Sequence, residues 1–367
     1  MAKESTYSIA CVPGDGIGTE IVEQATKVLN CLASISGAVS FSLTTFDWSS
    51  KTYAQTGSYM PDDWKQKVAE HDAILFGAVG WPTIPDHISL WGMILPMRTA
   101  LNQFVNIRPM RILEGTQSPL LSCQGKAEVL DWVIVRENSE GEYAGQGGIT
   151  HAHTPHAVAT DVSIFTRVAI ERIMRFAFET AKNRPRKKLT LVTKSNAQRH
   201  GMVLWDMIFD EIAKDYEGQV ECDKMLVDAM TVRMVKAPHS IDTVVATNLH
   251  ADILSDLAAA LAGSIGIAPS SSLDPTRQYP SLFEPIHGSA PDIAGRGVAN
   301  PIGTLWSAAE MVRWVGRGKL DDLADMLMNA IQNVLKEGIK TPDMSGSAST
   351  SEVGDAICDE LRRIAER

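Results

Sequence analysis

The stretch "DTVVATNLHADILSDLAAAL" (242–261) joins a short apolar run directly to a helix pattern. Residues 242–248 are rich in β-branched residues, which is typical of a buried strand. The segment that follows places Leu254, Leu257 and Leu261 on one stripe, close to the 3.6-residue period of an amphipathic helix. A buried strand that leads into a helix indicates an α/β protein with a mostly parallel sheet.

The same alternation continues along most of the chain. Strands are predicted at residues 7–12, 73–79, 130–137 and 188–193, and helices at 18–33, 163–184, 303–316, 320–337 and 350–366. Residues 145–163 interrupt the pattern, because they are rich in Gly, His and Thr and have only weak extended character. We expect this segment to form an arm or loop that projects from the body. The chain of 367 residues is long enough for about two domains, although no linker marks a boundary.

Composition excludes several classes of protein. The formal net charge of -10 argues against a nucleic-acid-binding surface, which needs a concentrated basic face. No run approaches the ~20 apolar residues of a membrane-spanning helix, and the N-terminus lacks the apolar run of a signal peptide. The five Cys are far apart and form no C-x-x-C motif, so we expect free thiols in a reducing compartment. These features predict a cytoplasmic protein.

Two aspartates define the first candidate site. Asp252 and Asp256 lie four residues apart on one face of the predicted helix, where like charges repel. Two carboxylates with few other ligands nearby suit Mg²⁺ or Mn²⁺, completed by water and substrate oxygens. On spacing alone, two solvated aspartates near a helix N-terminus are an equally good explanation. Asp228 is a third carboxylate beside an apolar run.

Basic residues also lie near the ends of predicted strands. Arg136 ends the strand at 130–137, at the edge where α/β proteins bind ligands, and guanidinium groups bind carboxylates in pairs of hydrogen bonds. Arg98 and Arg108 complete the set. Lys194 follows the strand at 188–193 and could act as a base if its neighbours lower its pKa. Taken singly, each arginine is better explained as an ion-paired or surface residue and Lys194 as a solvated lysine, and a lone Tyr143 as a packing residue.

Three further segments are open to two interpretations. The turn "PGDGIG" (13–18) has the spacing G-x-G-x-G and therefore lacks the Rossmann fingerprint; it is either a tight turn or part of a cofactor site. His151, His153 and His156 could bind a transition metal, but we favour a plain loop. In the long loop "FEPIHGSAPDIAGRGVANP" (283–301), Asp292 could bind a ribose 2′-OH and would repel a 2′-phosphate, which favours NAD over NADP.

Four stretches taken together resemble the β-decarboxylating dehydrogenases, the family of isopropylmalate, isocitrate, homoisocitrate and tartrate/D-malate dehydrogenases. They are "PGDGIG", "VRENSEGEYAG", "NLHADILSD" and "EPIHGSAPDIAGRGVANP", and their order matches over nearly the whole chain. The resemblance implies a two-domain, non-Rossmann α/β fold of the isopropylmalate dehydrogenase type. A large cofactor-binding domain would comprise residues 1–103 and 263–367, and a small dimerisation domain residues 104–262, with the arm near 145–163.

The resemblance also implies a role for each matching residue. Asp228, Asp252 and Asp256 would hold Mg²⁺ or Mn²⁺, with Lys194 and Asp228 contributed by the partner subunit of a homodimer that shares its active sites. Arg98, Arg108 and Arg136 would bind the substrate carboxylates. Lys194 would help to remove the hydroxyl proton, and Tyr143 would protonate the enolate carbon. The NAD pocket would be lined by Asn196, Glu284, His287, Gly288, Ser289, Ala290, Asp292 and Asn300. A need for a monovalent cation stays open.

The segment "DHISLWGMILPMR" (86–98) distinguishes the branches of the family. Isopropylmalate enzymes have Pro-Glu where this chain has Leu90 and Trp91, whereas Ile94 and Leu95 keep their apolar pair. With Trp91 expected to narrow the pocket, the chain is most similar to the tartrate/D-malate branch. This predicts oxidation of D-malate to pyruvate and CO₂, and of tartrate to oxaloglycolate. A 3-isopropylmalate dehydrogenase is the alternative within the family, and a catalytically silent regulatory subunit is the alternative of another class.

Overall fold

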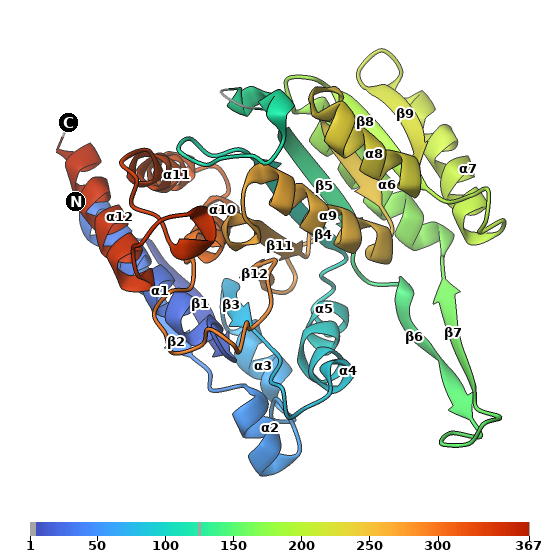
Figure 1. The fold of residues 1–367 in the computed structure, drawn as a ribbon, viewed down its shortest axis with the longest axis horizontal. Coiled ribbons are helices and arrows are strands. Elements are labelled where there is room, and N and C mark those ends of the chain that lie inside the picture. The colour runs from blue at the N-terminus through green and yellow to red at the C-terminus, as the bar shows by residue number, and fades with distance from the viewer. Residues whose placement is uncertain (1–4, 124–125, 367) are drawn as a thin grey trace.

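A mixed sheet of ten strands runs through the computed structural model, which describes residues 5–123 and 126–366 (Figure 1). The strands of this sheet are β1 (Ser5–Gly14), β2 (Val39–Thr45), β3 (Ala73–Ala78), β4 (Val105–Arg111), β5 (Asp131–Glu137), β8 (Lys188–Thr193), β9 (Glu221–Leu226), β10 (Thr243–Ala246), β11 (Pro269–Leu273) and β12 (Ser281–Pro285). Their order is β2-β1-β3-β12-β11-β4-β5-β10-β8-β9. All strands predicted from the sequence are present within a few residues of their expected bounds.

Helices cover the sheet and fill the connections between its strands. They are α1 (Gly18–Ser36), α2 (Ser50–Thr56), α3 (Trp64–Ala69), α4 (Asp86–Ser89), α5 (Leu95–Ala100), α6 (Arg167–Lys182), α7 (Gly201–Ala213), α8 (Val227–Lys236), α9 (Asn248–Ala262), α10 (Ile302–Gly316), α11 (Asp321–Lys336) and α12 (Thr350–Ala365). A single π-helical turn, Leu90–Ile94, joins α4 to α5. Short 3₁₀ turns occur at Leu121–Cys123, Ala127–Val129, Lys214–Tyr216, Pro238–Ser240, Ile265–Ile267 and Pro342–Met344.

The sheet is mostly parallel, as predicted, but the strands at its centre are antiparallel. Most neighbouring strands are parallel, but β11 is antiparallel to both β12 and β4, and β4 is antiparallel to β5. The turn between β11 and β12 is built by Asp274, whose carboxylate accepts hydrogen bonds from the backbone N–H groups of Thr276, Gln278 and Tyr279. The sequence did not reveal β11, because "PSSSL" is short and polar, although every residue in it is buried.

The two ends of the chain lie side by side. Helices α1 and α12 are packed together, and both termini appear on the same side of the molecule in Figure 1. A capping box between Ser349 and Glu352 begins α12, where each side chain satisfies a free backbone N–H at the helix start. The predicted large domain comprises residues 1–103 and 263–367, and the predicted small domain residues 104–262. This division would separate the sheet between β11 and β4, and it stays a prediction. Residues 1–4, 124–125 and 367 of these domains lie outside the described part of the chain.

Residues 141–164 form an antiparallel hairpin that projects from the body (Figure 1). Its strands are β6 (Gly141–Thr150) and β7 (Val158–Ile164), so the weakly extended arm predicted near 145–163 is a two-stranded β-ribbon, with a register shift between Gly141 and Gln146. His151 and His153 adopt positive φ angles in the connecting loop. Within residues 5–123 and 126–366, no cluster of three or more His, Cys, Asp or Glu side chains is arranged to hold a metal ion, so the geometry gives the three arm histidines no support as ligands.

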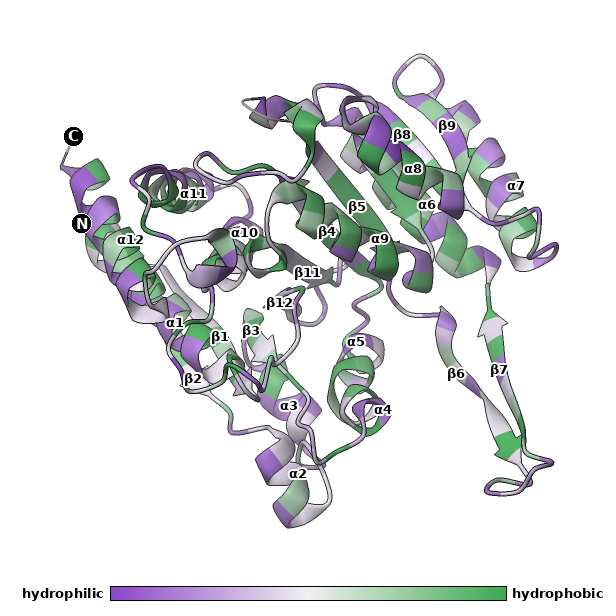
Figure 2. Cartoon of the chain, in the orientation of Figure 1, coloured by the Kyte–Doolittle hydropathy of each residue, from purple (hydrophilic) through white to green (hydrophobic). Residues whose placement is uncertain are grey.

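Apolar residues concentrate on the central strands. Figure 2 shows hydrophobic residues gathered on β5 and β8, whereas the covering helices carry both hydrophobic and hydrophilic residues. All five cysteines are free thiols, and four of them are buried. In the described part of the chain, no helix combines the length and the apolar character needed to cross a membrane.

Candidate active site

A cavity of about 210 Å³ brings most of the predicted catalytic and substrate-binding residues together. Its apolar lining is formed by Phe76, Val79, Leu90, Ile94 and Ile286. Its charged and hydroxyl-bearing lining residues are Arg98, Arg108, Arg136, Tyr143, Asp252 and Glu284. Of the expected apolar pair, Ile94 lines the cavity and Leu95 does not, while Leu90 does.

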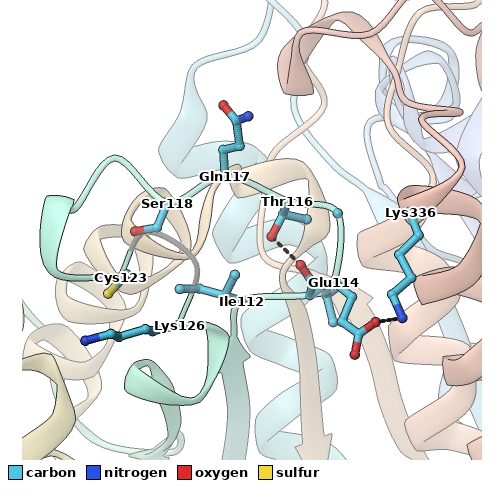
Figure 3. Close-up of a pocket in the computed structure, with 10 residues that line it drawn as sticks. Ile112, Glu114, Thr116, Gln117, Ser118, Cys123, Lys126 and Lys336 are labelled. Carbon is cyan, nitrogen blue, oxygen red and sulfur yellow. Dashed lines mark hydrogen bonds and ion pairs between the residues drawn. The ribbon is translucent and has the colours of Figure 1, made fainter.

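A larger cavity of about 550 Å³ lies elsewhere, between the loop at residues 112–118 and Lys336 (Figure 3). Its charged groups are mostly paired or solvated, as Figure 3 shows for the Lys336–Glu114 ion pair. We place the candidate active site in the smaller cavity, because buried charges converge there and perturbed titratable groups cluster at functional sites.

Two arginines reach the cavity from adjacent strands. Residues 106 and 136 face each other across β4 and β5, and so do 108 and 134, so Arg108 and Arg136 project from the same face of the sheet as diagonal neighbours. Asn248 accepts a hydrogen bond from Nε of Arg136 at 2.9 Å, and Asn106 accepts one from Nε of Arg108 at 2.9 Å. These two asparagines were not identified from the sequence, although a buried Asn inside an apolar strand was a signal for Asn106.

Helix α9 carries Asp252 over this pair of arginines. The carboxylate of Asp252 forms ion pairs with Arg136 and, at 3.4 Å, with Arg108, and it accepts a hydrogen bond from the Tyr143 hydroxyl at 3.2 Å. Burial alone would raise the pKa of Asp252, but the nearby guanidinium groups, Arg136 foremost, outweigh it and hold the pKa below its usual value. Asp252 is therefore a carboxylate at neutral pH.

The cavity retains uncompensated positive charge. Arg98 is buried and pairs with Glu284 at 3.2 Å. Burial lowers the pKa of Arg98, an effect that its partner Glu284 opposes. Burial together with Arg136 lowers the pKa of Arg108 to about 10, so Arg108 stays protonated at neutral pH. Three guanidinium groups face two carboxylates, Asp252 and Glu284, which leaves one positive charge in the cavity wall. Such a wall favours an anionic ligand, because guanidinium groups bind carboxylates in matched geometry.

Asp256 lies one helical turn beyond Asp252. Among the described residues, no side chain or backbone group donates a hydrogen bond to its carboxylate, and no cation pairs with it. Partial burial raises the pKa of Asp256, an effect that Arg108 opposes and the charge of Asp252 reinforces. Oxygen donors left free in this way suit a hard divalent cation, so Asp252 and Asp256 fit one edge of a metal site.

Lys194 and Asp228 pair with each other instead of joining this cavity. Lys194 Nζ donates to Asp228 Oδ1 at 2.5 Å, and that hydrogen bond lowers the pKa of Asp228. The side chain of Asp228 is 65% exposed, and neither residue lines the cavity of its own chain. In a single chain the geometry therefore brings together two of the three predicted metal ligands, and not the third.

The glycine turn at 13–18 holds the loop that follows β12. A Cβ atom on Gly16, which has a φ of 57°, would lie 2.0 Å from the carbonyl oxygen of Ser289, so only glycine allows this approach. Ile17 N–H donates to the same carbonyl oxygen at 2.9 Å. On the other side of the loop, Glu20 accepts hydrogen bonds from Gly295 and Gly297. The turn is thus a packing element that orders the long loop.

The residues predicted to bind NAD do not all face one space. His287 and Gly288 line the cavity, and the His287 side chain has a buried Nε2 with no partner among the described residues. Asp292 and Asn196 are exposed. Ser289 donates to Gly80 O at 2.6 Å, Ala290 has a positive φ of 39°, and Asn300 donates to Asp343 at 2.9 Å. His287 is the one buried polar group here that a ligand would satisfy.

Comparison with known proteins identifies the family of this chain. The family model described as "Isocitrate/isopropylmalate dehydrogenase" matches residues 8–357. A probable tartrate dehydrogenase/decarboxylase of Agrobacterium vitis is 54% identical over 355 residues, covering 97% of this chain and 98% of the relative. The D-malate dehydrogenase [decarboxylating] of Escherichia coli (strain K12) is 46% identical over 363 residues, with 98% and 99% covered.

Solved structures show the same fold. The crystal structure of isocitrate dehydrogenase from Methylococcus capsulatus superimposes with a TM-score of 0.85 at 32% identity, covering 97% of this chain and 99% of that one. The predicted fold class is therefore confirmed. The chain is an enzyme of the isocitrate/isopropylmalate dehydrogenase family.

Proposed function

We propose that this enzyme is an NAD-dependent and divalent-metal-dependent dehydrogenase of a small C4 2-hydroxy diacid. It would convert D-malate to pyruvate and CO₂, and tartrate to oxaloglycolate. The observation that carries the proposal is the cavity of about 210 Å³ in which three guanidinium groups, a tyrosine hydroxyl and Asp252 converge. The names of the Agrobacterium vitis and Escherichia coli relatives support the choice of substrates.

The residues of the cavity account for binding and proton transfer. Arg98, Arg108 and Arg136 bind and orient the two carboxylates of the substrate. Lys194 of the partner subunit would accept the proton of the C2 hydroxyl. NAD⁺, when bound, would supply the hydride acceptor. After CO₂ is lost, Tyr143 donates its phenolic proton to the substrate carbon. Burial raises the pKa of Tyr143, with a further contribution from Asp252, so the phenol keeps its proton at neutral pH.

Asp252 and Asp256, with Asp228 of the partner subunit, would hold Mg²⁺ or Mn²⁺. When bound, the cation supplies Lewis-acid polarisation of the substrate's C2 oxygen. His287, whose Nε2 is buried without a partner in the described residues, and the exposed Asp292 would bind NAD. A carboxylate at Asp292 would accept a hydrogen bond from a ribose hydroxyl and would repel a 2′-phosphate.

Exposed apolar residues support the homodimer. Ile149 and Val158 on the arm are 60% and 56% exposed, and Val232 on α8 and Ile253 on α9 are each 56% exposed. Large apolar side chains that gather on a hairpin and on neighbouring helices mark a surface for protein association. A second copy that covers this surface would bring Lys194 and Asp228 to the neighbouring cavity.

Steady-state kinetics of the purified chain with NAD⁺ and Mn²⁺ test the substrate. We expect kcat/KM to be highest for D-malate or tartrate. A value for 3-isopropylmalate that exceeds both by about tenfold or more would establish the alternative, in which Leu90 and Ile94 bind an alkyl group. Absence of NADH production from all three acids would instead support the silent regulatory subunit.

Mixed dimers test whether the active sites are shared. We expect Lys194→Met and Asp252→Asn homodimers to be inactive, whereas a coexpressed mixture regains about a quarter of the wild-type sites, because half of the dimers are mixed and each has one intact site. A mixture of Lys194→Met with Asp228→Asn is the matched control. Both changes affect residues that a subunit contributes to the active site of its partner, so neither site of a mixed dimer is intact. Equal activities in the two mixtures would contradict sharing.

Asp256→Asn separates metal binding from stability. Because the pKa of Asp256 is raised in the folded chain, its charged form opposes folding at neutral pH, and this penalty disappears as the pH falls. We therefore expect the metal-free variant to melt slightly above the wild type at neutral pH. The wild type should gain about 2.7 kcal/mol at a Mn²⁺ concentration 100 times Kd, and the variant far less. Equal stabilisation by Mn²⁺ in both proteins, measured by thermal unfolding with EDTA as the reference, would exclude Asp256 as a ligand.

A further inference from the structure

The π-helical turn at Leu90–Ile94 lies beside the substrate cavity, and its residues contact three different parts of the molecule. Single π turns inserted into α-helices are frequent at functional sites. Leu90 lines the cavity. The next two residues, Trp91 and Gly92, face the arm and Tyr59 respectively. The turn is therefore in contact with the substrate cavity, with the arm and with Tyr59.

Tyr59 packs against the turn at Gly92 and holds Ser89, the residue before the turn, by a hydrogen bond. A Cβ atom on Gly92 would lie 2.7 Å from the Tyr59 ring, so the turn is packed closely against that ring. The Tyr59 hydroxyl shares hydrogen bonds with Ser89 at 2.8 Å, at the residue before the turn, and with Ser50 at 3.1 Å. Ser50 in turn donates to Asp15 at 2.6 Å. All four of these side chains are buried, which makes this side of the turn rigid.

Trp91 bridges from the turn to the base of the arm. Trp91 is 46% exposed and does not line the cavity. The sequence predicted that Trp91 narrows the pocket, and the structure shows that it does not do so by filling the cavity. Instead its ring lies against Gly145 of β6, where a Cβ atom would come within 2.4 Å of the ring. Gly145 is only two residues beyond Tyr143, which lines the cavity. The ring thus joins the segment that carries Leu90 to the segment that carries Tyr143.

We propose that Trp91 is a positioning residue that sets the width of the cavity between the π turn and the base of the arm. The contact keeps the walls that carry Leu90 and Tyr143 close together, which favours a small diacid over one with an alkyl substituent at C3. Truncation of the ring removes this contact between the two segments, so the parts of the lining that carry Leu90 and Tyr143 can separate. The inference rests on the proposed function for its choice of substrates.

The test compares Trp91→Ala with the wild type on D-malate and 3-isopropylmalate. We expect the ratio of kcat/KM for 3-isopropylmalate to that for D-malate to rise by about tenfold or more, the scale on which pocket size discriminates between substrates. KM for D-malate should rise more than kcat falls, which a general loss of stability would not produce. An unchanged ratio in a folded Trp91→Ala variant overturns the inference.

Two glycines of β6 provide a matched control for the contact itself. Gly145 and Gly141 have similar positive φ angles of 67° and 75°, so alanine strains the backbone at both. A Cβ atom at Gly141 meets nothing closer than 3.4 Å, whereas at Gly145 it collides with Trp91. We expect Gly145→Ala to lower kcat/KM for D-malate, and the added Trp91→Ala change to restore part of that loss. No restoration, or equal restoration of Gly141→Ala, overturns the inference.

The two possible failures are distinguishable. If the wild type oxidises neither D-malate nor tartrate, the proposed function fails and the inference fails with it. If the wild type oxidises them and either Trp91 experiment gives its contrary result, the inference alone fails.

Discussion

Replacing Asp252 with asparagine is expected to reduce kcat/KM for D-malate by about 10³-fold or more. Metal ions stabilise transition-state charge by several kcal/mol, and each ~1.36 kcal/mol corresponds to a tenfold change in rate. Asparagine keeps the size of the side chain but removes the charge that faces Arg136 and Arg108 and accepts the Tyr143 hydrogen bond. The change therefore affects the metal, the carboxylate-binding arginines and the proton donor together.

Thermal unfolding gives the Asp252→Asn experiment a second readout. The pKa of Asp252 is held below its usual value, so its carboxylate stabilises the fold at neutral pH, and that stabilisation is lost as the pH falls through the lowered pKa. The variant should melt below the wild type at neutral pH, with a difference that shrinks in acid. Asp62→Asn is a suitable control, because Asp62 is exposed and forms no ion pair or hydrogen bond within the described residues. Undiminished turnover that is also insensitive to EDTA would contradict the proposed metal site.

Replacing Tyr143 with phenylalanine is expected to lower kcat for the conversion of D-malate to pyruvate by about 10²- to 10⁴-fold, the usual contribution of a general acid. The phenyl ring keeps its place beside Arg136, whose guanidinium carbon lies 5.5 Å from the ring centroid. Only the hydroxyl that donates to Asp252 is lost. Oxidation of tartrate to oxaloglycolate needs no protonation of carbon, so it should fall much less.

The contrast between the two substrates is the critical measurement for Tyr143. Because burial raises the pKa of this phenol, wild-type decarboxylation should persist as the pH rises and decline only when Tyr143 ionises. Tyr7→Phe is the matched control: Tyr7 packs against Phe41, with ring centroids 6.3 Å apart, far along the chain from the cavity residues. Equal losses for D-malate and tartrate in Tyr143→Phe would assign the hydroxyl to binding or orientation instead of proton donation.

Much of the candidate site could be predicted from the sequence because its residues follow strands. Parallel strands bring their carboxyl ends to one edge, and β5, β10 and β8 are parallel neighbours. Arg136 at the end of β5 and Asp252 in the helix after β10 therefore had to lie close together. The supporting residues were harder to identify. Asn248 and Ser255 hold the arginines from α9, and nothing in their spacing distinguished them from other polar residues of a helix.

The local pattern of the chain determined the strand–helix alternation, the presence of a projecting arm and the residue types that could bind a metal and a dianion, because hydrophobic period and side-chain chemistry are properties of short segments. Only the tertiary structure decided that β11 and β4 run antiparallel at the centre of the sheet. It also decided that Lys194 and Asp228 do not line the cavity of their own chain and that Trp91 lies against Gly145. Each of these depends on contacts between residues far apart along the chain, and no single segment encodes them.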